Sequence, residues 1–338
     1  DLNYSPIMDT SPILQVFPWN IYIAESLRKG FIPLWNPYNG AGVPLLANWQ
    51  STPFFPLKAI FYLFPGLRAF NLYCILCLFL GGVGTYAYAK EIKIGKRGAF
   101  FSTVTYTLCG YSLARIVYID NVTASCFPFL LFGTERILSD RGFLPYFSLI
   151  VAIVIFSGHP ETTVLIISAS VLYAVVHSWY TPKRMLPLFY SYVLGILLSS
   201  PMFLPFFEYL LHAEAHRITV KTQFSFFHPF KEIVSFFLPY LFPGGWSHMY
   251  IGIVGLCLGV FSVTRYSKNW PLLTVSIVGC ILTFRPPPLN YLMRVPPFSL
   301  LDPLYAIPLC TLPMSLMGGI ALKNLQRMKK YRNTFLII

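Results

Sequence analysis

The sequence predicts an all-α membrane protein in which about nine spanning helices form a bundle and a large loop region precedes them. The 338 residues are 56% hydrophobic and only 11% charged, as is typical of integral membrane proteins. Proline (28 residues) and glycine (22) are frequent, which membrane bundles tolerate because neighbouring helices satisfy the interrupted backbone. Together these observations exclude an ordinary soluble fold.

Nine apolar runs predict the spanning helices, although several are short or interrupted by proline. They cover about 70–89, 98–114, 121–137, 143–157, 162–180, 186–207, 248–264, 270–284 and 301–322. The segment 53–65 is also apolar, but it is too short to span a bilayer and holds three prolines. We expect it to be an interfacial or re-entrant piece.

Basic residues in the connections predict the orientation, because cytoplasmic loops are enriched in Lys and Arg. The connections on the side of 90–97 carry 15 of the 25 Lys and Arg residues and only three of the 12 acids. We expect this side to be cytoplasmic. The outer side is expected to hold four loop regions: residues 1–69, 157–163, 208–247, and 285–290 with the residues that follow. Because topology accounts for the net charge of +13, nucleic-acid binding is not expected.

Three regions follow from this topology. We expect an extracytoplasmic loop with interfacial helices at 1–69, a transmembrane helical bundle at 70–322 and a cytoplasmic basic tail at 323–338. The chain begins without Met and ends in the apolar Phe335–Ile338, so we also expect it to be truncated at both ends.

The stretch 31–56 differs from the rest of the chain. Five prolines and two glycines prevent a long helix, and the stretch carries amides and two tryptophans. We expect this stretch to form an ordered functional surface rather than a linker.

Asp9 lies in a mostly uncharged stretch beside the outer leaflet. A carboxylate there can act as a general base on an acceptor hydroxyl or bind a divalent ion. The structural alternative is a helix N-cap, with Asp9 or Thr10 beginning a helix over Ser11–Arg28 and Pro12 in its first turn.

His159 and Glu161 lie in a turn between two predicted spanning helices. The structural interpretation is that Gly158-His-Pro ends one helix and Pro160 opens the next, with Glu161 in its first turn. The functional interpretation is that both side chains contact a polar substrate at the mouth of the bundle.

Cations on the outer side are candidates for holding a phosphate. Arg217 and Lys221 are the best of them, and Arg294 follows in a proline-rich loop that also carries Arg285 and Asp302. Arg at a membrane interface often only extends its head group to water, which is the alternative for Arg285 and Arg294. His212 and His216 have metal-ligand spacing but lack the Glu of a zinc motif.

The sequence gives little sign of cysteine-based sites or of common catalytic and nucleotide-binding motifs. The seven cysteines lie mostly within apolar runs, which favours packing over a zinc site or a disulfide framework. No phosphate-binding loop, nucleophile elbow or dinucleotide fingerprint occurs in the sequence.

The order of several motifs resembles the bacterial YfhO-like membrane proteins. The longest match is Gly30–Ser51, which reads GFIPLWNPYNGAGVPLLANWQS, preceded by Asp9 and Phe17-Pro-Trp19. Shorter pieces follow in order: Gly110–Arg115, Pro128 with Glu135-Arg136, Gly158–Glu161, Leu204-Pro205 with Glu208 and Arg217, Tyr250–Gly252 and Pro296–Phe298. The resemblance covers nearly the whole chain.

The resemblance implies a GT-C-type glycosyltransferase, a polytopic enzyme that takes sugar from a polyprenyl-phosphate carrier on the outer face of the bacterial inner membrane. It implies Asp9 as the catalytic carboxylate and an extracytoplasmic glycan or lipid as acceptor, with a divalent cation as an open question. Arg217, Lys221 and Arg294 would hold the phosphate. The expected substrate-binding residues are Trp35, Asn36, Asn48, Gln50, His159 and Glu161.

Two functions of other classes remain open from the sequence. A transporter or flippase of lipid-linked saccharides would use the same basic groove without a base. A non-catalytic membrane scaffold would need neither.

Overall fold

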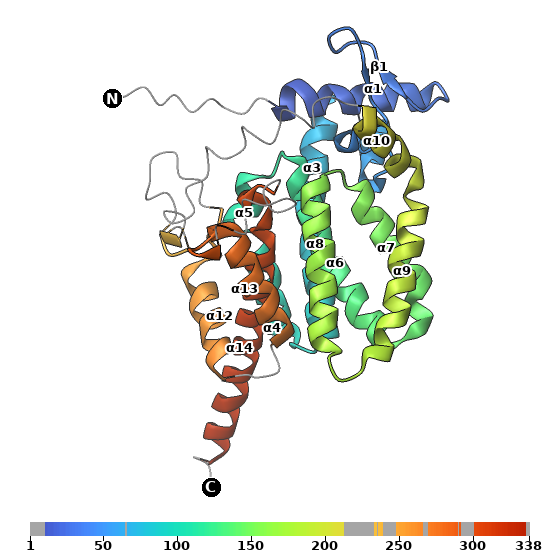
Figure 1. The fold of residues 1–338 in the computed structure, drawn as a ribbon. Helices are drawn as coiled ribbons and strands as arrows, with labels where there is room; N and C mark the ends of the chain where they lie inside the picture. Colours follow the sequence, from blue (N-terminus) through green and yellow to red (C-terminus); the bar gives the residue numbers. More distant parts are fainter. Residues whose placement is uncertain are drawn as a thin grey trace.

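The computed structural model describes residues 11–64, 66–212, 233–234, 236–238, 248–265, 270–289, 291 and 301–335. Across this part of the chain the structure is helical apart from one two-stranded sheet, and Figure 1 shows its longer helices side by side in a bundle. The predicted all-α class is confirmed.

Each of the nine predicted apolar runs contains helix. The corresponding elements are α3 (Gly66–Glu91), α4 (Lys96–Thr107) with α5 (Gly110–Ala114), α6 (Ile119–Ser139), α7 (Leu144–Phe156), α8 (Pro160–His177), α9 (Met185–Leu198) with α10 (Ser200–His212), α12 (Ile253–Arg265), α13 (Trp270–Phe284), and η11 (Pro303–Ala306) with α14 (Pro308–Phe335). Three runs are divided between two elements, and α9 and α10 meet at a bend of 73°. The sequence did not predict these divisions.

Among the described residues, three helices are long and apolar enough to cross a membrane. They are Gly66–Glu91, Pro160–His177 and Pro303–Gln326, and the bent pair α9–α10 would make a fourth. The surface of the bundle is also apolar, with Phe79 66% and Leu197 62% exposed on α3 and α9. Large exposed apolar side chains of this kind are compatible with a bilayer as the solvent.

One end of the bundle is covered by the N-terminal elements. The π-helical segment η1 (Pro12–Val16) and helix α1 (Phe17–Arg28) form one helical segment, as predicted, and Figure 1 shows it lying across the bundle. Strands β1 (Trp35–Asn36) and β2 (Val43–Pro44) pair above it. We call this the α1 end, and the end with the connection from α8 to α9 the opposite end.

The apolar segment 53–65 forms only short helices. These are η3 (Pro56–Ala59) and α2 (Ile60–Leu63), which follow the single turn η2 (Trp49–Ser51). Trp49 is buried, and its indole N–H donates to the carbonyl of Ile155 on α7 at 2.9 Å. The loop is therefore fastened to the bundle.

Connections that the sequence predicts on one side of the membrane also meet in space. At the α1 end the backbone N–H of Asp302 donates to the Glu161 carboxylate at 3.2 Å. At the opposite end Arg136 pairs with Glu91 at 3.2 Å, and Lys323 donates to the carbonyl of Lys93. Helix α14 continues through the predicted basic tail as far as Phe335.

Candidate functional site

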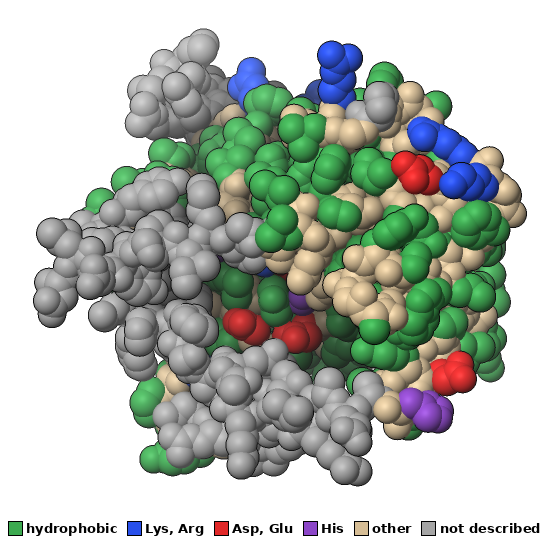
Figure 2. All heavy atoms as spheres, turned by 90° about the horizontal axis from the view of Figure 1, so that it is seen from above, with side chains coloured by type: hydrophobic (Ala, Val, Ile, Leu, Met, Phe, Trp, Pro, Cys, Tyr) green, Lys and Arg blue, Asp and Glu red, His purple; other side chains and the backbone are tan. Residues whose placement is uncertain are grey.

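The α1 end holds a group of ionisable side chains that we call the charged cluster: Arg115, Asp120, His159, Glu161 and Asp302. They come from the end of α5, the first turn of α6, the start of α8 and the residue before η11. Figure 2 shows acidic side chains and a histidine at the bottom of a hollow in this face. Most of the surrounding side chains that the figure colours are hydrophobic or uncharged.

Asp120 and Arg115 form the structural part of this cluster. The guanidinium donates to both carboxylate oxygens, at 2.7 Å and 3.0 Å, and the Tyr111 hydroxyl donates to the same carboxylate at 2.7 Å. The guanidinium also lies 3.6 Å from the ring centroid of Tyr118. Because Asp120 is buried, removing Arg115 would leave a buried charge without its partner, which is costly.

His159 is the N-cap of α8, as the structural interpretation of the sequence predicts. Its Nδ1 accepts the Thr162 backbone N–H at 3.2 Å and contacts the Thr162 hydroxyl at 2.9 Å. The neutral ring therefore carries its proton on Nε2. Burial lowers the pKa of His159 to about 4, against the opposing effect of Asp120.

The turn before His159 accepts only glycine. Gly158 has a φ of +106°, and a Cβ atom there would lie 1.9 Å from the Thr52 methyl group. This contact brings the end of the 31–56 stretch against the start of α8. The loop and the charged cluster therefore belong to the same end of the molecule.

Glu161 and Asp302 bring two carboxyl groups together from positions 141 residues apart. Glu161 accepts the Asp302 N–H, and Asp302 in turn caps η11 by accepting the Leu304 N–H at 2.9 Å. Both are only partly buried. Burial raises the pKa of Asp302, and Arg285 opposes this rise. Both acids are therefore partly accessible to a polar ligand.

Arg285 lies at the edge of this cluster. Its guanidinium donates to the carbonyl of Leu301, next to Asp302, and its backbone has a φ of +46°. A positive φ is strained for a residue with a side chain. The chain thus holds this cation close enough to interact with the Asp302 carboxylate, at a cost in backbone strain.

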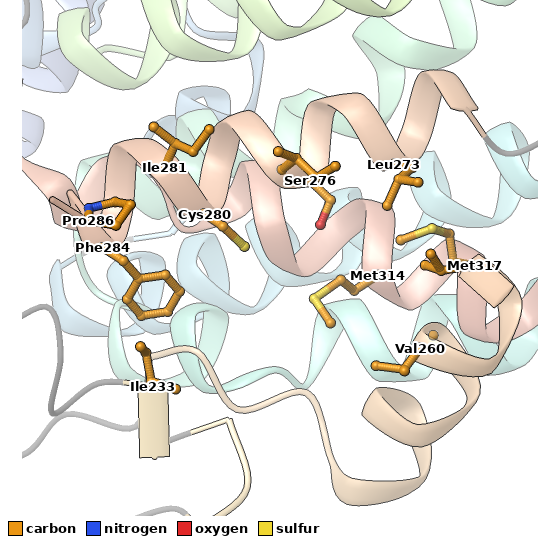
Figure 3. A pocket seen from close by; sticks show the side chains of 13 residues that line it. Ile233, Val260, Leu273, Ser276, Cys280, Ile281, Phe284, Pro286, Met314 and Met317 are labelled. Carbon is orange, nitrogen blue, oxygen red and sulfur yellow. The ribbon is translucent and has the colours of Figure 1, made fainter. Parts of the chain in front are cut away.

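An apolar pocket of about 360 Å³ reaches the same region from the side of the bundle. Figure 3 shows Phe284 and Pro286 at one end of it and Leu273, Met317 and Val260 at the other. Among the described residues that line the pocket, Ser276 is the one that carries a hydroxyl. The residue between Phe284 and Pro286 is Arg285.

The four predicted substrate-binding residues of the loop have different local environments. Trp35 is half exposed and packs over Gly42, while Asn36 is buried and accepts the Tyr38 N–H at 3.0 Å. Asn48 caps η2 by accepting the Gln50 N–H at 3.1 Å, and Gln50 is partly buried. The two asparagines therefore shape turns, and Trp35, at 50% exposed, is the most open of the four predicted loop residues.

Several predicted residues lie outside the described residues. These are Asp9, its alternative Asp1, the phosphate candidates Arg217, Lys221 and Arg294, and His216 of the histidine pair. His212 is exposed, and its ring contacts the backbone carbonyl of Glu208 at 2.8 Å. Within the described ranges no group of three or more His, Cys, Asp and Glu side chains is arranged to hold a metal ion.

Asp120, Tyr111 and Tyr305 were not predicted as site residues. Tyr305 packs against His159 with ring centroids 4.2 Å apart. A signal existed for Asp120, because an acid beside an apolar run, five residues after Arg115, is unusual in a membrane helix. None existed for Tyr305, which meets His159 only through the fold.

Comparison of the chain with models of known families, with curated proteins and with solved structures gives no match in any of the three. The resemblance to YfhO-like proteins therefore remains a prediction from the motifs.

Proposed function

We propose that the chain is a GT-C-type membrane glycosyltransferase. It moves a sugar from a polyprenyl-phosphate carrier to an extracytoplasmic polymer or lipid of the bacterial cell envelope. The observation that carries this proposal is the charged cluster with Arg285, which combines carboxylates and guanidinium groups at one end of an apolar bundle. Sugar transfer needs a base for the acceptor hydroxyl and cations for the departing phosphate.

The proposal takes the α1 end as the outer face of the inner membrane and about nine helical segments as spans. The excess of basic residues at the opposite end supports this orientation. Nucleotide sugars are not available outside the cell, so a sugar donor at this face has to be carried by a lipid.

In the proposed reaction the acceptor oxygen forms a bond to the anomeric carbon while the bond from that carbon to the carrier phosphate breaks. Asp9 takes the acceptor proton or orients a divalent ion, and the phosphate leaves on the carrier. Arg217, Lys221 and Arg294 are the phosphate ligands expected from the sequence. Glu161 and the open face of Trp35 contact the sugar or the acceptor.

The test compares envelope glycans in bacteria that lack the gene and carry it back as wild type or as variants. Asp9→Asn should lower sugar transfer by about 100-fold or more, the usual contribution of a general base. Glu161→Gln keeps an acceptor for the Asp302 N–H but removes the charge, and should also lower transfer. Asp140→Asn changes an acid at the opposite end that caps a turn, and should leave the glycans unchanged.

The same strains separate the alternatives. A flippase would retain its effect on the glycans in Asp9→Asn and in Asp1→Asn, and that result would show that these acids do not catalyse transfer. If no substitution between residues 30 and 51 alters any glycan, the result supports a non-catalytic membrane scaffold and contradicts the enzyme.

A further inference from the structure

Another pocket lies at the opposite end of the bundle, away from the charged cluster. Its volume is about 320 Å³, and it is lined by Ile137, Leu138, Ser139, Arg141, Arg184 and Pro187. These residues come from the end of α6, from η4 (Arg141–Phe143), from η5 (Pro182–Arg184) and from the start of α9. Two arginines from different connections therefore share one pocket.

Neither arginine is paired with an acid in the part of the chain that the structure describes. The ion pairs found there belong to other basic residues, and neither Arg141 nor Arg184 makes a further contact of this kind. Asp140, the acid beside the pocket, accepts the Gly142 N–H at 2.8 Å. Two like charges in one pocket repel each other, and an anion between them would compensate both.

The helices that begin beside the two arginines add to this positive potential. Helix α7 follows η4 and α9 follows η5, and the Ser191 hydroxyl of α9 contacts the Leu144 carbonyl of α7 at 3.4 Å. The two helices therefore start side by side. The first turn of a helix favours acids and disfavours cations, yet neither first turn here contains an acid. A bound anion would remove this unfavourable arrangement.

Exposed aromatic side chains surround the pocket at the same end. Tyr146 on α7 is 63% exposed, and Trp179 and Tyr180, shortly before η5, are 70% and 93% exposed. Exposed Trp and Tyr are typical of the membrane–water interface, where lipid head groups lie. Basic pockets between membrane helices at the cytoplasmic side bind the phosphates of such head groups. The pocket therefore lies at the level of a phospholipid phosphate.

We propose that this pocket binds a phosphate group and that Arg141 and Arg184 are its ligands. Such a group can belong to the head group of an anionic phospholipid or to a soluble phosphate ester, and the surrounding aromatic side chains favour the phospholipid. The site is independent of the proposed function, because it shares no residue with the charged cluster and lies at the other end of the bundle. It gives these two basic residues a specific ligand in addition to their role in orientation.

The experiment measures binding of phosphatidylglycerol to the purified chain by native mass spectrometry in detergent. The double variant Arg141→Gln/Arg184→Gln should weaken the tightest binding by about tenfold or more, as expected when charge-assisted hydrogen bonds are lost. Ser139→Glu keeps both arginines but adds a carboxylate to the pocket lining, and should also weaken binding. Diacylglycerol, which lacks the phosphate, should bind more weakly and should not respond to either change.

Two lysines at the same end provide a matched control. Lys96 and Lys183 are exposed like the two arginines, and Lys183 is the neighbour of Arg184, but neither lysine lines the pocket. Lys96→Gln/Lys183→Gln removes the same total charge and should bind phosphatidylglycerol as the wild type does.

A soluble competitor distinguishes the two sources of the phosphate. Glycerol 3-phosphate carries the phosphate without the acyl chains, and should displace phosphatidylglycerol only at a large excess. Displacement at equal concentration that is lost in Arg141→Gln/Arg184→Gln would keep the phosphate site and assign it to a soluble ester.

Two results would overturn the inference. One is an equal loss of binding in the arginine and lysine double variants, which would show that binding follows the total charge of this end. The other is unchanged binding in both Arg141→Gln/Arg184→Gln and Ser139→Glu. Either result leaves the proposed function standing if the envelope glycans still depend on Asp9. Conversely, binding that depends on the two arginines, without any effect of the gene on glycans, would keep the site and remove the enzyme.

Discussion

At the scale of single residues, the charged cluster contains two kinds of carboxylate. One is paired within the protein, and the others are accessible to a ligand. Asp120 is held by Arg115 and Tyr111 and is buried, so its charge is already compensated within the protein. The Glu161 carboxylate accepts the backbone N–H of Asp302, the Asp302 carboxylate accepts that of Leu304, and both side chains are only partly buried. A ligand at this end therefore meets the second pair, whereas the first pair holds α5 against α6.

The neutral state of His159 predicts a pH-dependent stability. The pKa of this histidine is about 4 in the folded protein, against 6.5 as its ordinary value. Between these values the unfolded chain binds a proton at this residue that the folded chain does not, so the contribution of His159 to the free energy of unfolding falls by about 2 kcal/mol from pH 7.5 to pH 5. Glu161 acts in the opposite direction, because burial raises its pKa to about 7 and the folded protein then binds its proton more tightly. A variant of His159 therefore isolates the contribution of the histidine.

Thermal unfolding in detergent at the two pH values measures this loss. His159→Asn keeps an N-cap side chain that can accept the Thr162 N–H but does not titrate, and should lose about 2 kcal/mol less than the wild type. If the free energy of unfolding changes equally in both proteins between the two pH values, a group other than His159 causes the pH dependence.

At the scale of elements, the bundle depends on close helix crossings. Helices α4 and α14 cross where Gly98 faces Gly319, and a Cβ atom on Gly319 would lie 2.1 Å from the Ser102 hydroxyl and 2.5 Å from the Gly98 carbonyl. Small residues at such crossings allow membrane helices to approach without a cavity. This crossing fixes α14, which forms one wall of the apolar pocket.

Gly319→Ala should therefore destabilise the protein by about 1–3 kcal/mol, the usual cost of overpacking. Gly81→Ala is the matched control, because its Cβ would meet Ser125 at an ordinary 3.4 Å and alanine favours the helix. Thermal unfolding should show a lower midpoint for the first variant and an equal or higher one for the second. A lower midpoint for Gly81→Ala than for Gly319→Ala would contradict the close approach of α4 and α14 at Gly319.

At the scale of the whole molecule, the elements could be predicted and their contacts could not. The hydrophobic runs predicted the helices, because the composition of a segment decides whether it is buried in lipid or in protein. The break at Ser199 and the meeting of Glu161 with Asp302 depend on how helices pack, which a single sequence does not display. The role of Asn36 and Asn48 in turns was missed for the same reason, because amides serve turns and ligands alike.

The whole account depends on which face of the membrane carries the α1 end. Two exposed tyrosines mark the two ends: Tyr38, 82% exposed between β1 and β2, and Tyr180, 93% exposed between α8 and α9. If the α1 end is outside, the donor has to be carried by a lipid. If it is inside, soluble nucleotide sugars are available and that argument fails.

Labelling of Tyr38→Cys and Tyr180→Cys with a membrane-impermeant maleimide in intact spheroplasts tests this orientation, with the wild type as the background from native cysteines. The account predicts that Tyr38→Cys is labelled in intact spheroplasts and that Tyr180→Cys is labelled only after lysis. Labelling of Tyr180→Cys in intact spheroplasts, with Tyr38→Cys protected until lysis, would contradict it.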